Sequence, residues 1–407
     1  MSFERAQSIA DAVLFEGYVL YPYRASSTKN RFRWTFGVLA PRAWSAGGGC
    51  EGWWLEAQVL VRTLTPRLRV RVRCLRVVER VVRVEGRAVD RLDVDGRIVT
   101  PWEEGEVKEI DLVVTGDAVA PFTFPAETTE EPVADSNGCR VGTVVRERLA
   151  ISGFIRATIS TVSLDPPLVR VSLRVENDSS VFPGIPRADA MRASLASTHL
   201  LVASEAGDLV SLADPPEELR AFARDTHNVG TYPMLMGAPG ERDLMLCAPI
   251  ILEEHPRIAP ESPGQLFDSG EIDEILSLRT RLLLPEEKAL ARASDPRTAA
   301  LIDRVDALDE DTLLRLHGVL TTAPPVFTPG TRVRLRPSAA GRRTDAQDLL
   351  YEGHTATVEQ VLDDVDGRRY LAVTIDDDPA AELHRWYGRF HHYYPDEVER
   401  LSTMEAV

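Results

Sequence analysis

Histidines and aspartates close to the C-terminus have the residue types of a metal site. The candidate ligands are His384, His391, His392, Asp376 and Asp378. Imidazole together with carboxylate suits zinc, nickel or iron. The histidines lack the His-x-x-x-His spacing that puts two ligands on one helix face. The tracts HHYY and DDDP in which these residues lie are also typical of polar loops. A metal-binding protein or metalloenzyme that uses these residues is therefore one hypothesis for the chain.

Motifs for nucleophilic or phosphate chemistry are missing from the sequence. It has no Gly-x-Ser-x-Gly elbow, and the three glycines at 47–49 are not followed by the lysine of a phosphate-binding loop. The cysteines are scattered without the Cys-x-x-Cys spacing of a zinc or redox site, at Cys50, Cys74, Cys139 and Cys247. These patterns predict a protein that is not an enzyme and that has no cofactor.

Length, charge and hydropathy argue against three classes of protein: nucleic-acid-binding, membrane-spanning and secreted proteins. The formal net charge of −16 over 407 residues argues against general nucleic-acid binding, which draws its affinity from a positive surface. No apolar run approaches the roughly 20 residues that a membrane helix needs, and the first residues lack the layout of a signal peptide. We therefore expect a cytoplasmic protein of about two or three domains, without membrane insertion.

Aromatic and cationic residues gather around a Ser-Ser-Thr-Lys-Asn turn near the N-terminus. They are Tyr21, Tyr23, Arg24, Lys29 and Trp34. Aromatic rings and arginine dominate the hot spots of protein interfaces, so this segment is a candidate surface for a protein partner or an anionic ligand. The alternative is a hairpin whose aromatic rings close one end of a β-domain.

The stretch from His255 to Lys288 has the sharpest local signals in the chain. Its prolines predict an irregular arm, after which Asp268 or Ser269 offers an N-cap for a helix. Three acidic residues occupy the start of that helix, namely Glu271, Asp273 and Glu274. They are candidates for contact with a basic partner or a hard cation, or they serve only the helix dipole. Pro285 predicts the start of a second helix.

Valine and arginine alternate along residues 68–74, as expected for a half-buried antiparallel strand. The arginine row on such a strand would bind phosphate or an acidic partner, or it is a solvated sheet face that discourages aggregation.

The chain as a whole predicts a multidomain α+β protein. Residues 1–185 are expected to form a β-rich, sandwich-like domain, and residues 186–320 an α+β domain that ends in a helical segment. A Thr-Thr-Ala-Pro-Pro linker then leads to residues 326–402. Their order of turns and alternating strands resembles a small SH3-like or KOW-like β-barrel, which implies nucleic-acid binding as a weaker alternative function.

Three stretches together resemble a known family. They are ADAVLFEGYVLYPYRASSTKNRFRWTFGVLAP, IAPESPGQLFDSGEIDEILSLR, and the ending PGTRVRLRP, GHTATVEQVLDD and YLAVTIDDDP. The match, over nearly the full length, is to an uncharacterised family of actinobacterial-type proteins encoded beside nickel–iron hydrogenase genes. The tract YGRFHHYYP departs from the family pattern, which leaves any role for His391 and His392 open.

The resemblance implies that the gene lies beside hydrogenase genes, and it identifies no catalytic residues in this chain. It leads us to expect a non-catalytic accessory or assembly protein. Its implied partner is a nickel–iron hydrogenase subunit or the maturation machinery of that enzyme.

Overall fold

The computed structural model describes residues 3–259, 262, 264–268, 272–309, 327–337, 350–363 and 369–401. The chain divides into two compact units, Met1–Gly318 and Val319–Val407. The expected boundary between residues 185 and 186 falls inside the first unit. There, strands on both sides of that boundary belong to one sheet.

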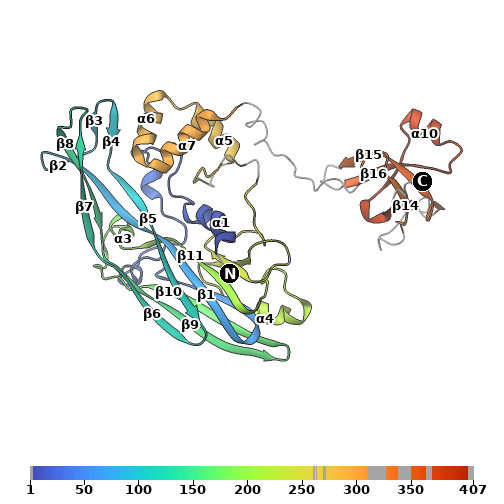
Figure 1. Ribbon diagram of the computed structural model, residues 1–407, viewed down its shortest axis with the longest axis horizontal. Coiled ribbons are helices and arrows are strands. Elements are labelled where there is room, and N and C mark those ends of the chain that lie inside the picture. The colour runs from blue at the N-terminus through green and yellow to red at the C-terminus, as the bar shows by residue number, and fades with distance from the viewer. Residues whose placement is uncertain are drawn as a thin grey trace. The chain divides into compact units, whose positions relative to one another are not determined.

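An antiparallel sheet of 11 strands forms the frame of the first unit (Figure 1). Its strands are β1 (Trp54–Val84), β2 (Arg87–Val89), β5 (Trp102–Val114), β6 (Ala118–Phe124), β7 (Glu127–Ala134), β8 (Arg140–Arg148), β9 (Ile151–Leu164), β10 (Pro167–Asn177), β11 (Leu195–Leu209), β12 (Tyr232–Leu235) and β13 (Leu244–Ala248). A separate hairpin consists of β3 (Leu92–Val94) and β4 (Arg97–Val99).

Strand β1, 31 residues long, organises this sheet. It pairs in turn with β10, β11, β5, β8 and β2. The register against β11 shifts between Arg62 and Arg67. Across this shift the buried apolar positions change from odd to even numbers, from Leu55, Ala57, Val59 and Val61 to Leu68, Val70, Val72 and Cys74. Both halves of β1 therefore face one core.

That core also takes side chains from β5, β6, β9, β10, β11 and β13. A sheet that packs against itself in this way fits the expected sandwich-like arrangement. The alternation of valine and arginine correctly predicted the half-buried part of β1.

Helices cover the sheet. They are α1 (Glu4–Leu14), α2 (Arg42–Ala46), α3 (Arg187–Met191), α4 (Arg220–Arg224), α5 (Asp273–Arg281), α6 (Pro285–Ser294) and α7 (Pro296–Ala307), with 3₁₀ turns η1 (Lys29–Phe32) and η2 (Glu217–Leu219). Helix α1 packs its apolar face on β11, β12 and β13. Figure 1 shows α5, α6 and α7 grouped near the β3–β4 hairpin, which α6 contacts.

Local sequence signals fix the starts of the last two of these helices. Proline occupies the first position of α6 and of α7, as Pro285 and Pro296. The Asp295 carboxylate accepts a hydrogen bond from the Arg297 amide at 2.8 Å. In contrast, α5 begins after Ile272 without a side-chain cap, so Asp268 does not have the N-cap role expected of it.

The second unit has a five-stranded antiparallel sheet in the order β17-β16-β15-β14-β18. These strands are β14 (Arg332–Leu335), β15 (Thr355–Asp363), β16 (Arg369–Ile375), β17 (His391–Tyr393) and β18 (Val398–Arg400), joined by α10 (Ala381–Tyr387) and η4 (Pro395–Glu397). They enclose a small apolar core around Val358, Leu371 and Tyr393. The molecule is thus mixed α and β with several antiparallel sheets, whereas an SH3-like barrel is still only a prediction.

Within the part of the chain that the structure describes, no helix has the length and apolar character needed to cross a membrane.

A buried histidine gives the first unit a specific sensitivity to acid. His199, on β11 opposite Arg73 of β1, is fully buried, and burial lowers its pKa to about 4 from an ordinary value of 6.5. Between these two values the unfolded chain binds a proton that the folded chain does not, so stability falls as the pH drops from about 6.5 to 4. The loss expected over this range is about 3 kcal/mol.

We predict that His199→Gln removes most of this acid dependence. Urea unfolding at intervals between pH 7 and pH 4, followed by circular dichroism, measures it. The control is His392→Gln, since His392 is exposed. An unchanged pH slope in the His199→Gln variant would contradict the assignment.

Candidate partner-binding site

A single asparagine holds the shape of the segment that follows α1. The Asn30 side chain accepts a hydrogen bond from the Leu20 amide at 2.7 Å. Its amide group donates to the carbonyls of Leu20 and Arg24, at 2.9 and 3.1 Å. Asn30 is only 5% exposed, so the turn is fixed from within and sets the positions of the aromatic and cationic residues around it.

The structure places two of the predicted contact residues in the interior. Tyr23 is completely buried, and its hydroxyl donates to the Leu266 carbonyl at 3.1 Å. Trp34 is 4% exposed, and its indole nitrogen donates to Glu103 at 3.0 Å. Burial raises the pKa of Tyr23 above its ordinary value. These two rings pack inside the first unit and are not available to a partner.

Arg33, which was not among the predicted contact residues, lies at the centre of this aromatic cluster. The Arg33 guanidinium lies 3.6 Å from the ring centre of Trp102 and donates to the Tyr18 carbonyl at 2.9 Å. Glu103 also pairs with it, at 3.5 Å. Burial lowers the pKa of Arg33 to about 10, so it stays charged at neutral pH. A buried charge with these partners stabilises one arrangement of the cluster.

Gly105 on β5 lets the N-terminal segment approach the sheet closely. A Cβ atom at this position would lie 2.7 Å from the Tyr18 ring and 3.2 Å from the Trp34 ring. The Tyr18 hydroxyl donates to Asp295 at 2.6 Å. Burial, reinforced by that carboxylate, raises the pKa of Tyr18. Tyr18 thus ties the start of α7 to the sheet.

Carboxylates of the helical segment neutralise the cations of the N-terminal turn. Lys29 pairs with Asp268 at 2.5 Å, and Arg24 pairs with Glu287 at 2.8 Å. Asp268 also accepts the Tyr21 amide at 3.0 Å. The structure therefore brings this predicted surface into contact with the chain's own helical segment. Tyr21, Arg24 and Lys29 remain partly accessible at its edge.

The segment that contains α5 has five exposed aliphatic side chains, of which Ile275 and Leu278 lie in the helix itself. They are Ile272, Ile275, Leu278, Leu282 and Leu284, with exposures of 66%, 38%, 43%, 82% and 64%. The opposite side of the same segment, with Leu276 and Leu283, is buried in the aromatic core. The first four follow a helical spacing, so this segment has one apolar side that is buried and one that is exposed.

The acidic residues predicted for this helix lie at its N-terminal end. Asp273 is exposed and Glu274 is half-buried, whereas Glu271 lies outside the described residues. The exposed side of α5 thus carries Ile275 and Leu278, with an acidic residue at its start and Arg279 and Arg281 in its last turn.

A cavity of about 360 Å³ adjoins this acidic end. Ala12, Ile258 and Phe267 give it an apolar wall, and its acidic lining residues are Glu16, Asp268 and Asp273. Partial burial and the negative charge of Glu16 raise the pKa of Asp273. The cavity therefore combines apolar surface with negative charge.

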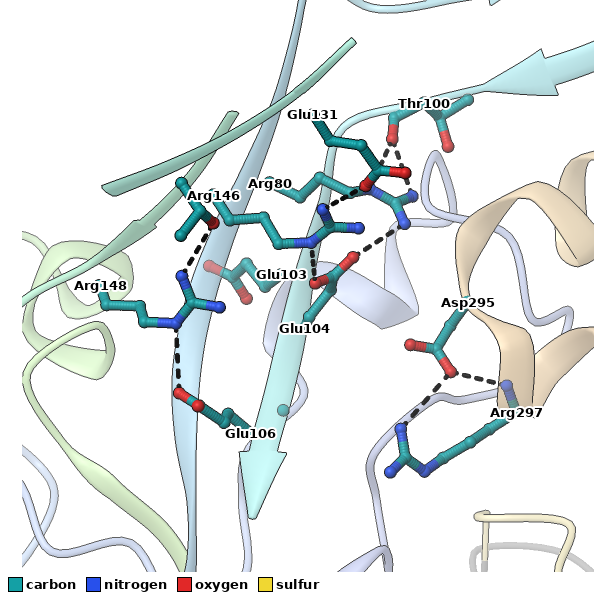
Figure 2. Close-up of polar contacts among 12 residues, drawn as sticks. Arg80, Thr100, Glu103, Glu104, Glu106, Glu131, Arg146, Arg148, Asp295 and Arg297 are labelled. Atoms are coloured by element: carbon teal, nitrogen blue, oxygen red, sulfur yellow. Dashed lines mark hydrogen bonds and ion pairs between the residues drawn. The ribbon is translucent and has the colours of Figure 1, made fainter. Parts of the chain in front are cut away.

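The arginine row of the sheet is paired with the sheet's own carboxylates. Figure 2 shows Glu104 bound by Arg80 at 3.0 Å and by Arg146 at 2.7 Å. Arg146 also contacts Glu131 at 2.8 Å. Further along β1, Arg71 pairs with Asp111, and Arg73 with Glu109 and Asp11. The alternating arginines thus make intramolecular ion pairs across neighbouring strands.

Of the C-terminal histidines and aspartates, His384 and His391 lie side by side, with ring centres 6.5 Å apart, while the others make separate contacts. His384 lies 3.1 Å from Asp378. Asp376 instead pairs with Arg332 at 2.8 Å, and His392 packs against Tyr370. Among the described residues, no group of three or more His, Cys, Asp or Glu side chains is placed to hold a metal ion. Metal binding by these residues stays a prediction.

Comparisons with known proteins add little to this picture. No family model and no curated protein matches the chain. Among solved structures, the Salmonella SPI-1 type III secretion injectisome secretin InvG, in the open gate state, matches at 9% identity with a TM-score of 0.11. The match covers 46% of this chain and 47% of that one, so it spans about half the length of the secretin chain. A TM-score this low carries no argument.

We predict that Glu104→Ala destabilises the first unit by about 2 kcal/mol, because it leaves the nearly buried Arg80 guanidinium without its charged hydrogen-bond partner. Glu131→Ala is the matched control, since its side chain is 65% exposed, and it should cost less than about 1 kcal/mol. Urea unfolding measures both. Equal losses in the two variants would show that the shared Glu104 carboxylate has no special role.

Proposed function

We propose that this protein is a non-catalytic, cytoplasmic accessory or assembly protein that binds a nickel–iron hydrogenase subunit or the maturation machinery of that enzyme. The observation that carries the proposal is the exposed aliphatic face of α5. The hydrogenase connection rests on the resemblance of three stretches of the sequence to proteins encoded beside hydrogenase genes.

An exposed helix face of this composition suits protein binding. Burying one leucine or isoleucine side chain contributes about 1.5–3 kcal/mol. Four such residues at helical spacing provide the anchors of a helix-in-groove or helix-on-helix contact. The rest of the helix is held by Leu276 and Leu283 in the core, so the exposed face is ordered before a partner arrives, which lowers the entropic cost of binding.

Of the two candidate surfaces for partner binding, α5 is favoured over the N-terminal turn. Tyr23 and Trp34 are already used in the interior, and Lys29 and Arg24 are neutralised by the helical segment. The aliphatic residues of α5, in contrast, face solvent.

We predict that the double variant Leu278→Ser, Leu282→Ser loses at least about tenfold in recovery of hydrogenase subunits or maturation factors. Affinity purification of the tagged full chain from its native host, with quantitative mass spectrometry of those named proteins, measures it. The folded state should be unaffected, because both side chains are already exposed.

The matched control is Leu164→Ser, Phe182→Ser, which removes two apolar side chains that are 74% and 82% exposed elsewhere in the unit. Equal recovery with both double variants would rule out α5 as the contact surface. If the wild-type chain captures no hydrogenase subunit or maturation factor, the proposed partner is wrong.

A further inference from the structure

A cavity of about 570 Å³ lies between the β3–β4 hairpin and the helices α6 and α7. Small and apolar side chains make up most of its wall, among them Ile98, Val99, Ala289, Ala293 and Ala299. The charged side chains that line it are Arg80, Arg97, Arg292 and Asp295. More positive than negative side chains therefore line this cavity, although the chain as a whole has a formal net charge of −16.

Arg80 joins the two sides of this cavity. Its guanidinium donates to the Thr100 carbonyl, directly after the hairpin, at 2.8 and 3.0 Å (Figure 2). It also donates to the Ala293 carbonyl in α6 at 3.1 Å. Arg80 is 7% exposed, so a buried side chain fixes the hairpin against the helix. The cavity is therefore formed before any ligand binds, as is usual for small-molecule sites.

The other two arginines of the cavity have N–H groups that remain for a ligand. Arg97, an exposed residue of β4, makes no ion pair with any of the described residues. Arg292 binds Asp303 at 2.8 Å and Asp306 at 3.1 Å through Nε and Nη2, which leaves its Nη1 group. Asp306 also pairs with Lys288 at 2.5 Å, so the charge of this carboxylate is shared. The planar fork of arginine matches the oxygens of a carboxylate or phosphate.

The remaining carboxylates near the cavity have partners of their own. Asp295 accepts from the Tyr18 hydroxyl at 2.6 Å and from a backbone amide of α7 at 2.8 Å. Glu104, which contacts the buried arginine, is also bound by Arg146 at 2.7 Å. Two further carboxylates of these elements are exposed and do not line the cavity, namely Asp95 and Glu286.

We propose that this cavity binds a small organic anion, with its carboxylate or phosphate group on Arg97 and Arg292 and its apolar body against the small side chains of the wall. The volume is within the usual range of ligand pockets, about 300–1,000 Å³. An inorganic anion would leave the apolar wall uncovered, and a neutral apolar molecule would leave the arginines without a counter-ion. The inference goes beyond the proposed function, because it concerns a different surface from α5 and does not depend on a protein partner.

Isothermal titration calorimetry of the full chain with four probes tests the proposal. The probes are phenyl phosphate, benzoate, inorganic phosphate and benzyl alcohol. We expect phenyl phosphate or benzoate to bind with a Kd of about 1 mM or lower. That affinity should be at least about tenfold higher than the affinity for inorganic phosphate or for the neutral alcohol, because only the organic anions use both the charge and the wall. The tighter of the two organic anions identifies the head group. Failure of both to bind would overturn the proposal.

The double variant Arg97→Gln, Arg292→Gln should weaken binding of the tighter organic anion by at least about tenfold. The control is Arg87→Gln, Arg220→Gln, which changes the net charge equally. Arg87 is an exposed strand residue like Arg97, and Arg220 is a helical arginine that pairs with a carboxylate, Glu217, at 2.8 Å. The control should keep the affinity of the wild-type chain. Equal losses in the two double variants would show only general attraction of anions to arginine, and the proposed site would be wrong.

A third variant, Ala289→Leu, tests the cavity without a change in charge. The larger side chain takes up space at the apolar wall, so it should also weaken binding of the organic anion. The fold should tolerate it, because Ala289 is only half-buried, and circular dichroism of each variant checks this. An unchanged affinity in the folded Ala289→Leu variant would place the anion outside the cavity and contradict the proposal.

Discussion

Backbone hydrogen bonding along β1 is the constraint on which the rest of the first unit depends. Buried N–H and C=O groups must find partners, and a strand of 31 residues presents them along two long edges. Five other strands satisfy these edges in succession. Because β5 is one of them, its first residues, from Trp102 to Gly105, lie where Tyr18 and Arg33 pack. The aromatic cluster is therefore positioned by the sheet.

The same sheet explains how the chain accommodates so much arginine. Alternation places arginine on one side of β1, and antiparallel pairing brings carboxylates of β5 opposite, as with Arg71 and Asp111. These carboxylates offset the charge of the arginines, although the Nη1 atom of the buried Arg73 has no hydrogen-bond partner among the described residues. Most of these pairs are partly exposed and contribute little individually. The buried ones, around Arg73 and Arg80, are costly to break because the remaining charge has no water to replace its partner.

Local patterns in the sequence predicted the elements better than they predicted the contacts between them. Alternation correctly identified the half-buried part of β1, and Pro285 correctly marked the start of α6. The sequence could not show that Asp268 accepts the Tyr21 amide, 247 positions away. Its local neighbourhood favours an N-cap. The carboxylate instead accepts a hydrogen bond from the Tyr21 amide, and a pairing over such a distance cannot be predicted from patterns in a single sequence.

The N-terminal turn illustrates a more general ambiguity. Aromatic rings and cations are the composition of an interface hot spot and also of a buried cluster with internal counterions. A buried cluster differs from an interface hot spot in having carboxylates from elsewhere in the fold as partners, here Asp268, Glu287 and Asp295. The glycine at 105, inside a strand, was a usable signal of close approach. It did not identify which rings would approach.

For helix α5, the sequence predicted that acidic side chains would contact a partner, whereas the structure shows exposed aliphatic side chains. One face of the helix is fixed in the aromatic core, so the other face cannot rotate inward to hide its isoleucines and leucines. A partner that packs on this exposed face would find it already ordered, because Leu276 holds the helix in the core.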